Sequence, residues 1–259
     1  GELGNVRVVD YAEITPIPVK PKKKIILLGA VIGGFLVGCG LIFLKQMLVN
    51  RGVSSSSLVE RETGASVYAK VPITEMGKKK QIEHVVLAIA DPHDYAVEKI
   101  RSLRTALEFS FIDNGGKVLA VTGISSGDGK SFISTNLSVL FKQMNKKVLL
   151  IDCDLRKNYK NEKKIKGLSD LLYENATLEE VLKESSFPHC DYVGRGLRTT
   201  MPSELLASSK FTNVIASLRD QYDLIVIDTP PLNYFSDAQW VCRRADFALL
   251  IMRSGAYSM

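Results

Sequence analysis

Cysteine is scarce in this sequence. Four cysteines (Cys39, Cys153, Cys190 and Cys242) stand far apart among 259 residues, and no two form a Cys-x-x-Cys pair. The spacing therefore predicts neither a zinc site nor a disulfide framework, and it is typical of a chain kept in a reducing compartment. Charge is also absent from one long stretch, residues 25–44, which contains no Asp, Glu, Lys or Arg.

The overall composition excludes disorder of the whole chain. Hydrophobic residues make up 46% of the 28.6 kDa chain, which has room for one well-buried α/β domain plus appendages. The net charge of +6 is modest, and part of the excess lies in lysine runs at 22–24, 78–80 and 163–164. A basic run beside a hydrophobic span indicates a membrane surface more readily than a nucleic acid, whereas the two later runs are more typical of solvated loops.

The uncharged stretch 25–44 is long enough to cross a membrane. As a helix, its twenty residues would span about 30 Å, the thickness of the hydrocarbon core of a bilayer. No small-residue cleavage site follows it, so a signal peptide is not indicated. We predict a transmembrane helix, in which Gly34 and Gly38 have the spacing of a helix-packing motif.

Beyond this helix the sequence alternates between helical and strand patterns. Val97, Ile100, Leu103 and Leu107 recur at helical spacing, and a second helix is expected from about 130 to 144. Four short apolar stretches are typical of buried strands: 117–122, 147–152, 224–228 and 247–252. This alternation predicts an α/β fold with a doubly wound, mostly parallel sheet.

A glycine-rich loop lies between the first strand and the following helix, as in a phosphate-binding P-loop. Its candidate nucleotide-binding residues are Ser125, Ser126, Gly127, Asp128, Gly129, Lys130, Ser131 and Phe132. Loop amides and a helix N-terminus bind phosphate, a lysine at this place contacts the outer phosphates, and the Ser131 hydroxyl can bind Mg²⁺. The spacing departs from the usual motif, because Gly123 comes one residue early. A glycine-rich turn before a helix is the alternative.

Three aspartates follow predicted strands. Asp152 and Asp154 end the second strand, and Asp228 ends the third. In a parallel sheet, ligands bind at these strand ends, where carboxylates can hold Mg²⁺ and accept a proton from an attacking hydroxyl. Each aspartate alone could be a helix cap. Together with the P-loop they indicate a nucleotide hydrolase or phosphotransferase.

The motifs together resemble those of bacterial tyrosine kinases (BY-kinases), whose catalytic domain is related to the MinD/ParA ATPases. In that family residues 124–131 would be the Walker A motif, 148–156 Walker A′ and 224–231 Walker B. MinD/ParA proteins have a lysine where this chain has Ser125, which favours the kinase branch. The resemblance implies Lys130, Asp152, Asp154 and Asp228 as catalytic residues, with Asp152 as candidate base. It implies Ser131, Asp154 and Asp228 as the magnesium site.

Two further sets of residues match the family. Glu98, Arg101 and Arg104 fit its ExxRxxR motif, which implies a subunit contact in a ring-like homo-oligomer such as an octamer; the alternative is an intrahelical Glu–Arg pair. Residues 202–206 match its PSELL segment. Tyr159 falls where relatives have a gating tyrosine, and Arg195 matches the arginine that receives it once phosphorylated. As an ordinary loop residue, Tyr159 needs no such role.

The resemblance also implies a domain organisation. Residues 1–24 look like the end of an extracytoplasmic Wzz-type chain-length domain, 25–44 form the membrane helix, 45–90 a cytoplasmic linker and 91–259 the kinase domain. We expect the chain to be truncated at its start and to stop before the final helix and tyrosine-rich tail of the family. The charges conflict on orientation: lysines at 20 and 22–24 outnumber Lys45 and Arg51 and would place the N-terminal side in the cytoplasm. ATP is found in the cytoplasm, so we expect the kinase domain to lie in the cytoplasm and residues 1–24 to lie outside, against the lysine count.

The implied function is ATP- and Mg²⁺-dependent autophosphorylation of tyrosines in trans, regulating capsule or exopolysaccharide export at the bacterial inner membrane. The implied partners are the chain itself, the membrane, the polysaccharide polymerase and export machinery, and a tyrosine phosphatase, but no nucleic acid. Two alternatives remain: a MinD/ParA-like membrane-bound ATPase, and an export scaffold that binds ATP without catalysis.

Overall fold

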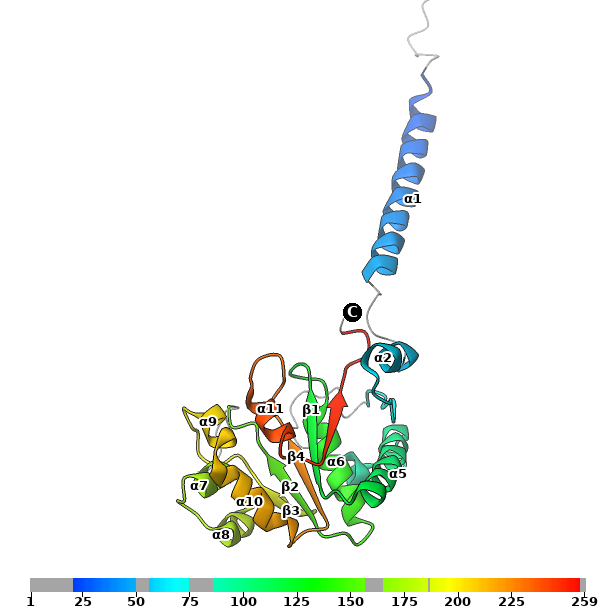
Figure 1. The fold of residues 1–259 in the computed structure, drawn as a ribbon. Coiled ribbons are helices and arrows are strands. Elements are labelled where there is room, and N and C mark those ends of the chain that lie inside the picture. The colour runs from blue at the N-terminus through cyan, green and yellow to red at the C-terminus, as the bar shows by residue number, and fades with distance from the viewer. Residues whose placement is uncertain (1–20, 50–55, 75–85, 157–164, 186, 257–259) are drawn as a thin grey trace, which may run out of the picture. The chain divides into compact units, whose positions relative to one another are not determined.

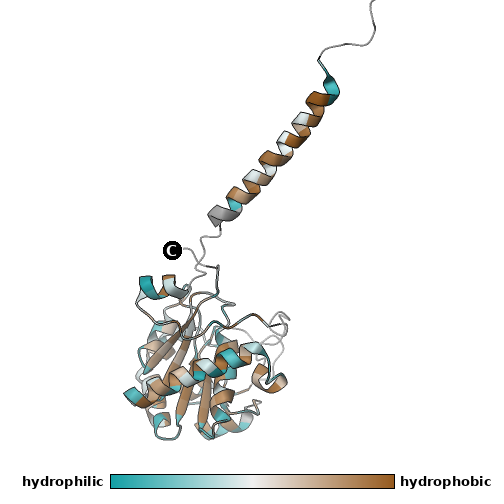
Figure 2. Cartoon of the chain, turned by 90° about the vertical axis from the view of Figure 1, so that its right-hand side faces the viewer, coloured by the Kyte–Doolittle hydropathy of each residue, from teal (hydrophilic) through white to brown (hydrophobic). Residues whose placement is uncertain are grey.

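The computed structural model describes residues 21–49, 56–74, 86–156, 165–185 and 187–256, which belong to two compact units, 1–52 and 53–258. The first unit contains helix α1 (Lys23–Val49), which includes the uncharged stretch 25–44. Its span Lys23–Lys45 is long and apolar enough to cross a membrane. Figure 2 shows this helix mainly in the brown of hydrophobic residues. Most of the predicted segment 1–24 lies outside the described residues.

The second unit is built on a five-stranded sheet in which every strand pair is parallel (Figure 1). The strands are β1 (Val118–Gly123), β2 (Val148–Asp152), β3 (Asp191–Val193), β4 (Leu224–Asp228) and β5 (Phe247–Ile251), in the order β3-β2-β4-β1-β5. Every residue of β1, β2 and β4 is buried, which explains their continuous apolar sequences. The predicted parallel α/β fold is confirmed.

Helices cover both faces of the sheet (Figure 1). On one face lie α4 (Leu87–Ala90), α5 (Tyr95–Asn114) and α6 (Lys130–Lys142). On the other lie α7 (Leu168–Leu172), α8 (Leu178–Glu184), α9 (Pro202–Ala207), α10 (Ser209–Arg219) and α11 (Asp237–Cys242). Successive residues of β1 face opposite cores: Leu119 and Val121 pack in the first, Val118 and Ala120 in the second.

The segment 45–90, predicted as a linker, carries structure of its own. It contains α2 (Ser56–Thr63) and α4, whose Leu87 and Ala88 are buried in the first core. The Ala88 amide donates to Oδ1 of Asn136 on α6 at 2.9 Å. The end of this segment therefore packs onto the helix that follows the P-loop.

The parallel register brings the ends of three strands together. Asp152 at the end of β2 is the register partner of Asp228 at the end of β4, and Asp228 is also paired with Val121 of β1. Because β1 leads into the P-loop, the predicted phosphate and acidic residues lie at the same edge of the sheet.

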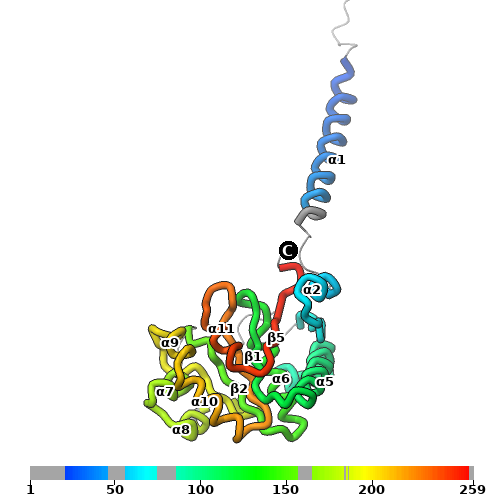
Figure 3. Tube along the Cα trace, in the orientation of Figure 1, coloured from blue at the N-terminus to red at the C-terminus, as the bar shows by residue number. Residues whose placement is uncertain are grey.

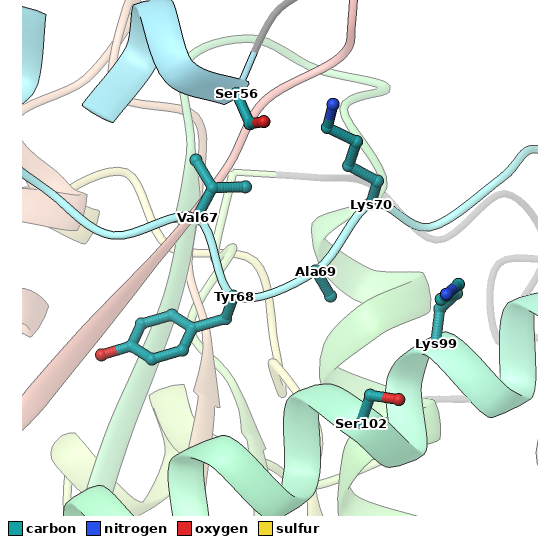
Figure 4. Close-up of a pocket in the computed structure, with 7 residues that line it drawn as sticks. All are labelled: Ser56, Val67, Tyr68, Ala69, Lys70, Lys99 and Ser102. Carbon is teal, nitrogen blue, oxygen red and sulfur yellow. The ribbon is translucent and has the colours of Figure 1, made fainter. Parts of the chain in front are cut away.

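A surface cavity of about 310 Å³ lies elsewhere, between residues 67–70 and α5 (Figure 4). It is lined by Ser56, Val67, Tyr68, Ala69, Lys70, Lys99 and Ser102. None of these belongs to the P-loop or to the aspartates at the strand ends, so this cavity is separate from the candidate site.

Candidate functional site

The P-loop connects β1 to α6 and is held in shape by its own side chains. Gly127 and Gly129 have φ values of +86° and +99°, which glycine adopts far more readily than other residues. The Ser125 amide donates to Oδ2 of Asp128 at 2.8 Å, and Lys130 Nζ donates to the Ser125 carbonyl oxygen at 2.8 Å. A glycine-rich loop of this shape before a helix, with a lysine beside it, has the groups that bind a phosphate.

Gly123, which comes one residue earlier than the first glycine of the usual motif, is required by the packing around it. A Cβ at Gly123 would lie 2.9 Å from the carbonyl oxygen of Ile251 and 3.1 Å from the stem of Lys130. The last residue of β1 must therefore be small, because the stem of Lys130 and the Ile251 carbonyl oxygen pack directly against it. The Phe132 side chain packs against the first core, so at the site this residue can contribute its backbone amide.

A second loop, which sequence reasoning missed, supports the P-loop. The Leu232 and Asn233 amides donate to the carbonyl oxygens of Gly123 and Ile124 at 2.9 and 3.0 Å. The Asn233 side chain donates to the Ser125 hydroxyl at 3.3 Å. In Figure 3 this loop, between β4 and α11, lies at the same end of the sheet as the loop after β1. In the sequence, the only signal for this supporting loop is that Asn233 comes soon after Asp228.

The aspartates at the strand ends lie close together, with Asp152 and Asp228 buried and Asp154 half-buried. The Asp154 amide donates to Oδ1 of Asp152 at 2.9 Å, and the Cys153 amide donates to the Asp228 carbonyl oxygen at 2.9 Å. Burial, followed by the nearby Asp152 charge, raises the pKa of Asp228 from 3.8 to about 7. A hydrogen bond from the Ser131 hydroxyl and the charge of Lys130 oppose this rise.

The residues around Asp228 fit a magnesium ion bound with a nucleotide. Among the described residues, Asp228 Oδ1 is buried and accepts no hydrogen bond, and the Ser131 hydroxyl lies against the same carboxylate. The described part of the chain has no group of three or more His, Cys, Asp or Glu side chains placed to hold a metal by themselves. Magnesium commonly binds one or two carboxylates and completes its shell with water and phosphate oxygens, so this donor set suits it.

Arg195, predicted as a regulatory residue, pairs with Asp152. Its Nε donates to Asp152 Oδ2 at 2.6 Å, and both side chains are at most 4% exposed. The next residue, Gly196, has φ +81°, and a Cβ there would lie 2.4 Å from Oδ2 of Asp170. This close packing fixes the backbone that carries the arginine. Tyr159, the predicted gate, lies outside the described residues.

The ExxRxxR residues lie on α5 and do not join the nucleotide site. Glu98 and Arg101 form an ion pair, and Arg101 Nη1 also donates to the Pro92 carbonyl oxygen at 2.9 Å. Arg104 Nη1 donates to the Leu140 carbonyl oxygen of α6 at 3.2 Å. Within one chain, both arginines therefore have local partners.

Comparison with known families gives two matches along the chain. Residues 1–47 match a family described as "G-rich domain on putative tyrosine kinase". Residues 116–259 match a family described as "AAA domain". The second match includes the P-loop and all three aspartates at the strand ends.

Individual relatives of this chain are also tyrosine kinases. The "Tyrosine-protein kinase wzc" of Salmonella typhi is 39% identical over 97% of this chain, which spans 37% of that relative's length. The solved "BceF Tyrosine Kinase Domain" is 33% identical, with a TM-score of 0.70 over 80% of this chain and 88% of that one. The kinase domain of the Escherichia coli tyrosine kinase ETK is 34% identical, with a TM-score of 0.69 over 78% and 82%. The chain therefore belongs to the family of bacterial tyrosine kinases.

Proposed function

We propose that this chain is the nucleotide-binding, membrane-anchored part of an ATP-dependent protein-tyrosine autokinase. The observation that carries the proposal is the set formed by buried Lys130, half-buried Ser131 and buried Asp228 beside a glycine-rich loop. A lysine, a hydroxyl and an unsatisfied carboxylate oxygen are the groups needed to bind a magnesium–nucleotide complex. Membership of the tyrosine kinase family then favours a tyrosine hydroxyl over water as acceptor.

In the proposed reaction, the γ-phosphoryl group passes in line from ATP to a tyrosine hydroxyl. Lys130 and the amides of residues 125–132 stabilise the negative charge of the phosphates. Ser131, Asp154 and Asp228 would hold Mg²⁺, which would supply positive charge beside the phosphate oxygens. Because phosphoryl transfer needs little covalent help from the protein, positioning and charge stabilisation are the main contributions of these residues.

Asp152 is the proposed base for the tyrosine proton. Each of its oxygens already accepts one hydrogen bond, from the Asp154 amide and from Arg195. A carboxylate offers about four acceptor positions, so it can accept a further proton donor without losing these partners. Arg195 would hold the carboxylate in a fixed orientation while it does so.

The wider setting is proposed from the family. The helix α1 would anchor the chain in the bacterial inner membrane with the P-loop domain in the cytoplasm, where ATP is available. Tyrosines would be phosphorylated in trans on neighbouring subunits of a ring, with Glu98, Arg101 and Arg104 at the contact. The modification would regulate capsule or exopolysaccharide polymerisation and export, and a tyrosine phosphatase would reverse it.

The test is an anti-phosphotyrosine assay of the chain with MgATP and a random glutamate–tyrosine copolymer as acceptor. Lys130→Met is expected to lower phosphotyrosine formation at least about 100-fold, because it removes a charge that stabilises the transition state. Lys142→Met is the matched control, since Lys142 ends the same helix on an exposed position. That variant should retain the activity of the unsubstituted chain.

Each other outcome identifies an alternative. ATP hydrolysis that depends on Lys130 but yields no phosphotyrosine would indicate a MinD/ParA-like ATPase. Nucleotide binding without hydrolysis or transfer would indicate a scaffold that uses ATP only for assembly. Equal activity of the two lysine variants would mean that the P-loop does not perform the reaction.

A further inference from the structure

Arg156 lies at the centre of a polar cluster that the proposed reaction does not use. The residue follows Asp154 by two positions, in the segment after β2. Its Nε donates to Asp237 Oδ2 at 2.6 Å, and its Nη2 donates to Asp237 Oδ1 at 3.1 Å. The arginine thus makes a bidentate contact with both oxygens of one carboxylate, and the Asp237 side chain is only 1% exposed.

Two other elements complete the cluster. Nη2 of Arg156 also donates to the Ser203 hydroxyl at 2.9 Å, and that hydroxyl donates to Asp237. The guanidinium carbon lies 4.1 Å from the ring centroid of Phe235, a cation–π contact. Ser203 is the serine of the PSELL segment on α9, and Glu204 beside it adds a favourable Coulombic interaction with Arg156.

The cluster connects the segment that contains Asp154, after β2, to the segment that follows Asp228, after β4. On one side, Arg156 lies two residues after Asp154 in the same segment. On the other, Phe235 and Asp237 belong to the segment that begins after Asp228 and supports the P-loop through Asn233. Arg156 is the last described residue of this segment, and its contacts with Asp237 and Ser203 attach the segment to the rest of the domain.

We propose that Arg156, Ser203 and Asp237 form a clamp that positions Asp154 relative to Asp228 for binding of the magnesium–nucleotide complex. Arg156 is then a positioning residue, and the PSELL segment supplies the hydroxyl that completes the clamp. Lysine cannot replace the arginine, because an ammonium lacks the planar fork that reaches both oxygens of Asp237 and Ser203 together. The inference rests on the proposed function only in naming the ligand.

Arg156→Lys keeps the positive charge and removes the fork. In the nucleotide-free chain, we expect faster hydrogen–deuterium exchange at amides 153–156, with exchange in α6 unchanged. In titrations with a fluorescent ATP analogue, the Mg²⁺ concentration at half-saturation should rise about tenfold, the lower end of what loss of an outer-shell partner costs. Ser203→Ala should give a smaller change in the same direction, and it keeps the ion pair if Arg156→Lys folds poorly.

Arg219→Lys is the matched control. Arg219 Nη1 pairs with Asp246 Oδ2 at 2.7 Å, and that carboxylate binds the amides at the start of β1, at the opposite end of the strand from the P-loop. The control should leave both the Mg²⁺ midpoint and exchange at 153–156 unchanged. An equal shift in the control, or unchanged exchange and midpoint in Arg156→Lys, would overturn the clamp.

The clamp and the proposed function fail in different ways. If the unsubstituted chain binds MgATP but makes no phosphotyrosine, the kinase proposal fails while exchange and Mg²⁺ dependence still decide the role of Arg156. If Arg156→Lys loses phosphotyrosine formation with unchanged exchange and Mg²⁺ midpoint, the clamp is wrong and the kinase proposal stands.

Discussion

Arg195 and Asp152 form a buried ion pair at the edge of the sheet where the candidate site lies. The Nε–Oδ2 distance is 2.6 Å, and the side chains are 4% and 3% exposed. Two charges removed from water stabilise a fold only while they remain together, because either one alone keeps its full desolvation penalty. The pair therefore ties the orientation of the proposed base to an arginine that comes 43 residues later in the sequence.

Removing one partner of this pair should be costly. Arg195→Met leaves Asp152 buried without its cation, and we expect the free energy of unfolding to fall by about 3–5 kcal/mol. The double variant Arg195→Met, Asp152→Asn should recover part of that loss, because no uncompensated charge remains. Urea denaturation of both single variants and the double variant measures the coupling.

The half-buried pair Arg219–Asp246 is the comparison for this experiment. Its side chains are 33% and 27% exposed, so Arg219→Met should cost about 1 kcal/mol or less. Additive losses for Arg195 and Asp152 would show that the two residues stabilise the fold independently.

The stability of the metal-free chain should depend on pH through Asp228. The unfolded chain releases this proton near its ordinary pKa of 3.8, whereas the folded chain retains it up to about 7. Because the folded state binds more protons between these values, the contribution of Asp228 to stability falls as pH rises through this window. Asp228→Asn carries no such proton, so urea midpoints measured at pH 5 and pH 8 should differ less for the variant.

Magnesium and ATP should reverse this pH effect. At pH 8, MgATP should raise the urea midpoint of the unsubstituted chain by mass action and leave that of Asp228→Asn nearly unchanged. Parallel pH dependence in the two proteins would mean that Asp228 is already ionised in the folded state near pH 5.

Gly123→Ala should weaken ATP binding. The added methyl group would press on the Lys130 stem and on the Ile251 carbonyl oxygen, so the lysine must shift from the phosphate site. We expect about a tenfold loss of affinity for ATP, corresponding to about 1.4 kcal/mol, measured by titration calorimetry. Gly64→Ala is the control: its φ of +69° makes the substitution cost about 1–2 kcal/mol in stability, but nothing of the nucleotide site lies within 4 Å of the new Cβ.

The sequence carried enough information to predict four of the five strands and the P-loop, while the short edge strand β3 was missed. Residues 224–228 form an unbroken apolar strand ended by an aspartate, and the glycine-rich loop follows a strand directly, so both signals are local. The Arg195–Asp152 and Arg156–Asp237 pairs were not predictable from spacing, because 43 and 81 residues separate their members. Such contacts follow from the order of strands in the sheet, which no local pattern specifies.

The predicted ring contact through Glu98, Arg101 and Arg104 can be tested by measuring both assembly and the free energy of unfolding. If Glu98 and Arg101 contact a neighbouring subunit, Glu98→Ala and Arg101→Ala should lower the assembled fraction in sedimentation velocity, while the free energy of unfolding changes by about 0.5 kcal/mol or less. Arg104→Ala should lower both, because this half-buried guanidinium also binds the Leu140 carbonyl oxygen of α6. Lys99→Ala removes a charge from the same helix and should alter neither. If Glu98→Ala and Arg101→Ala leave sedimentation unchanged, their ion pair serves only the helix that contains it.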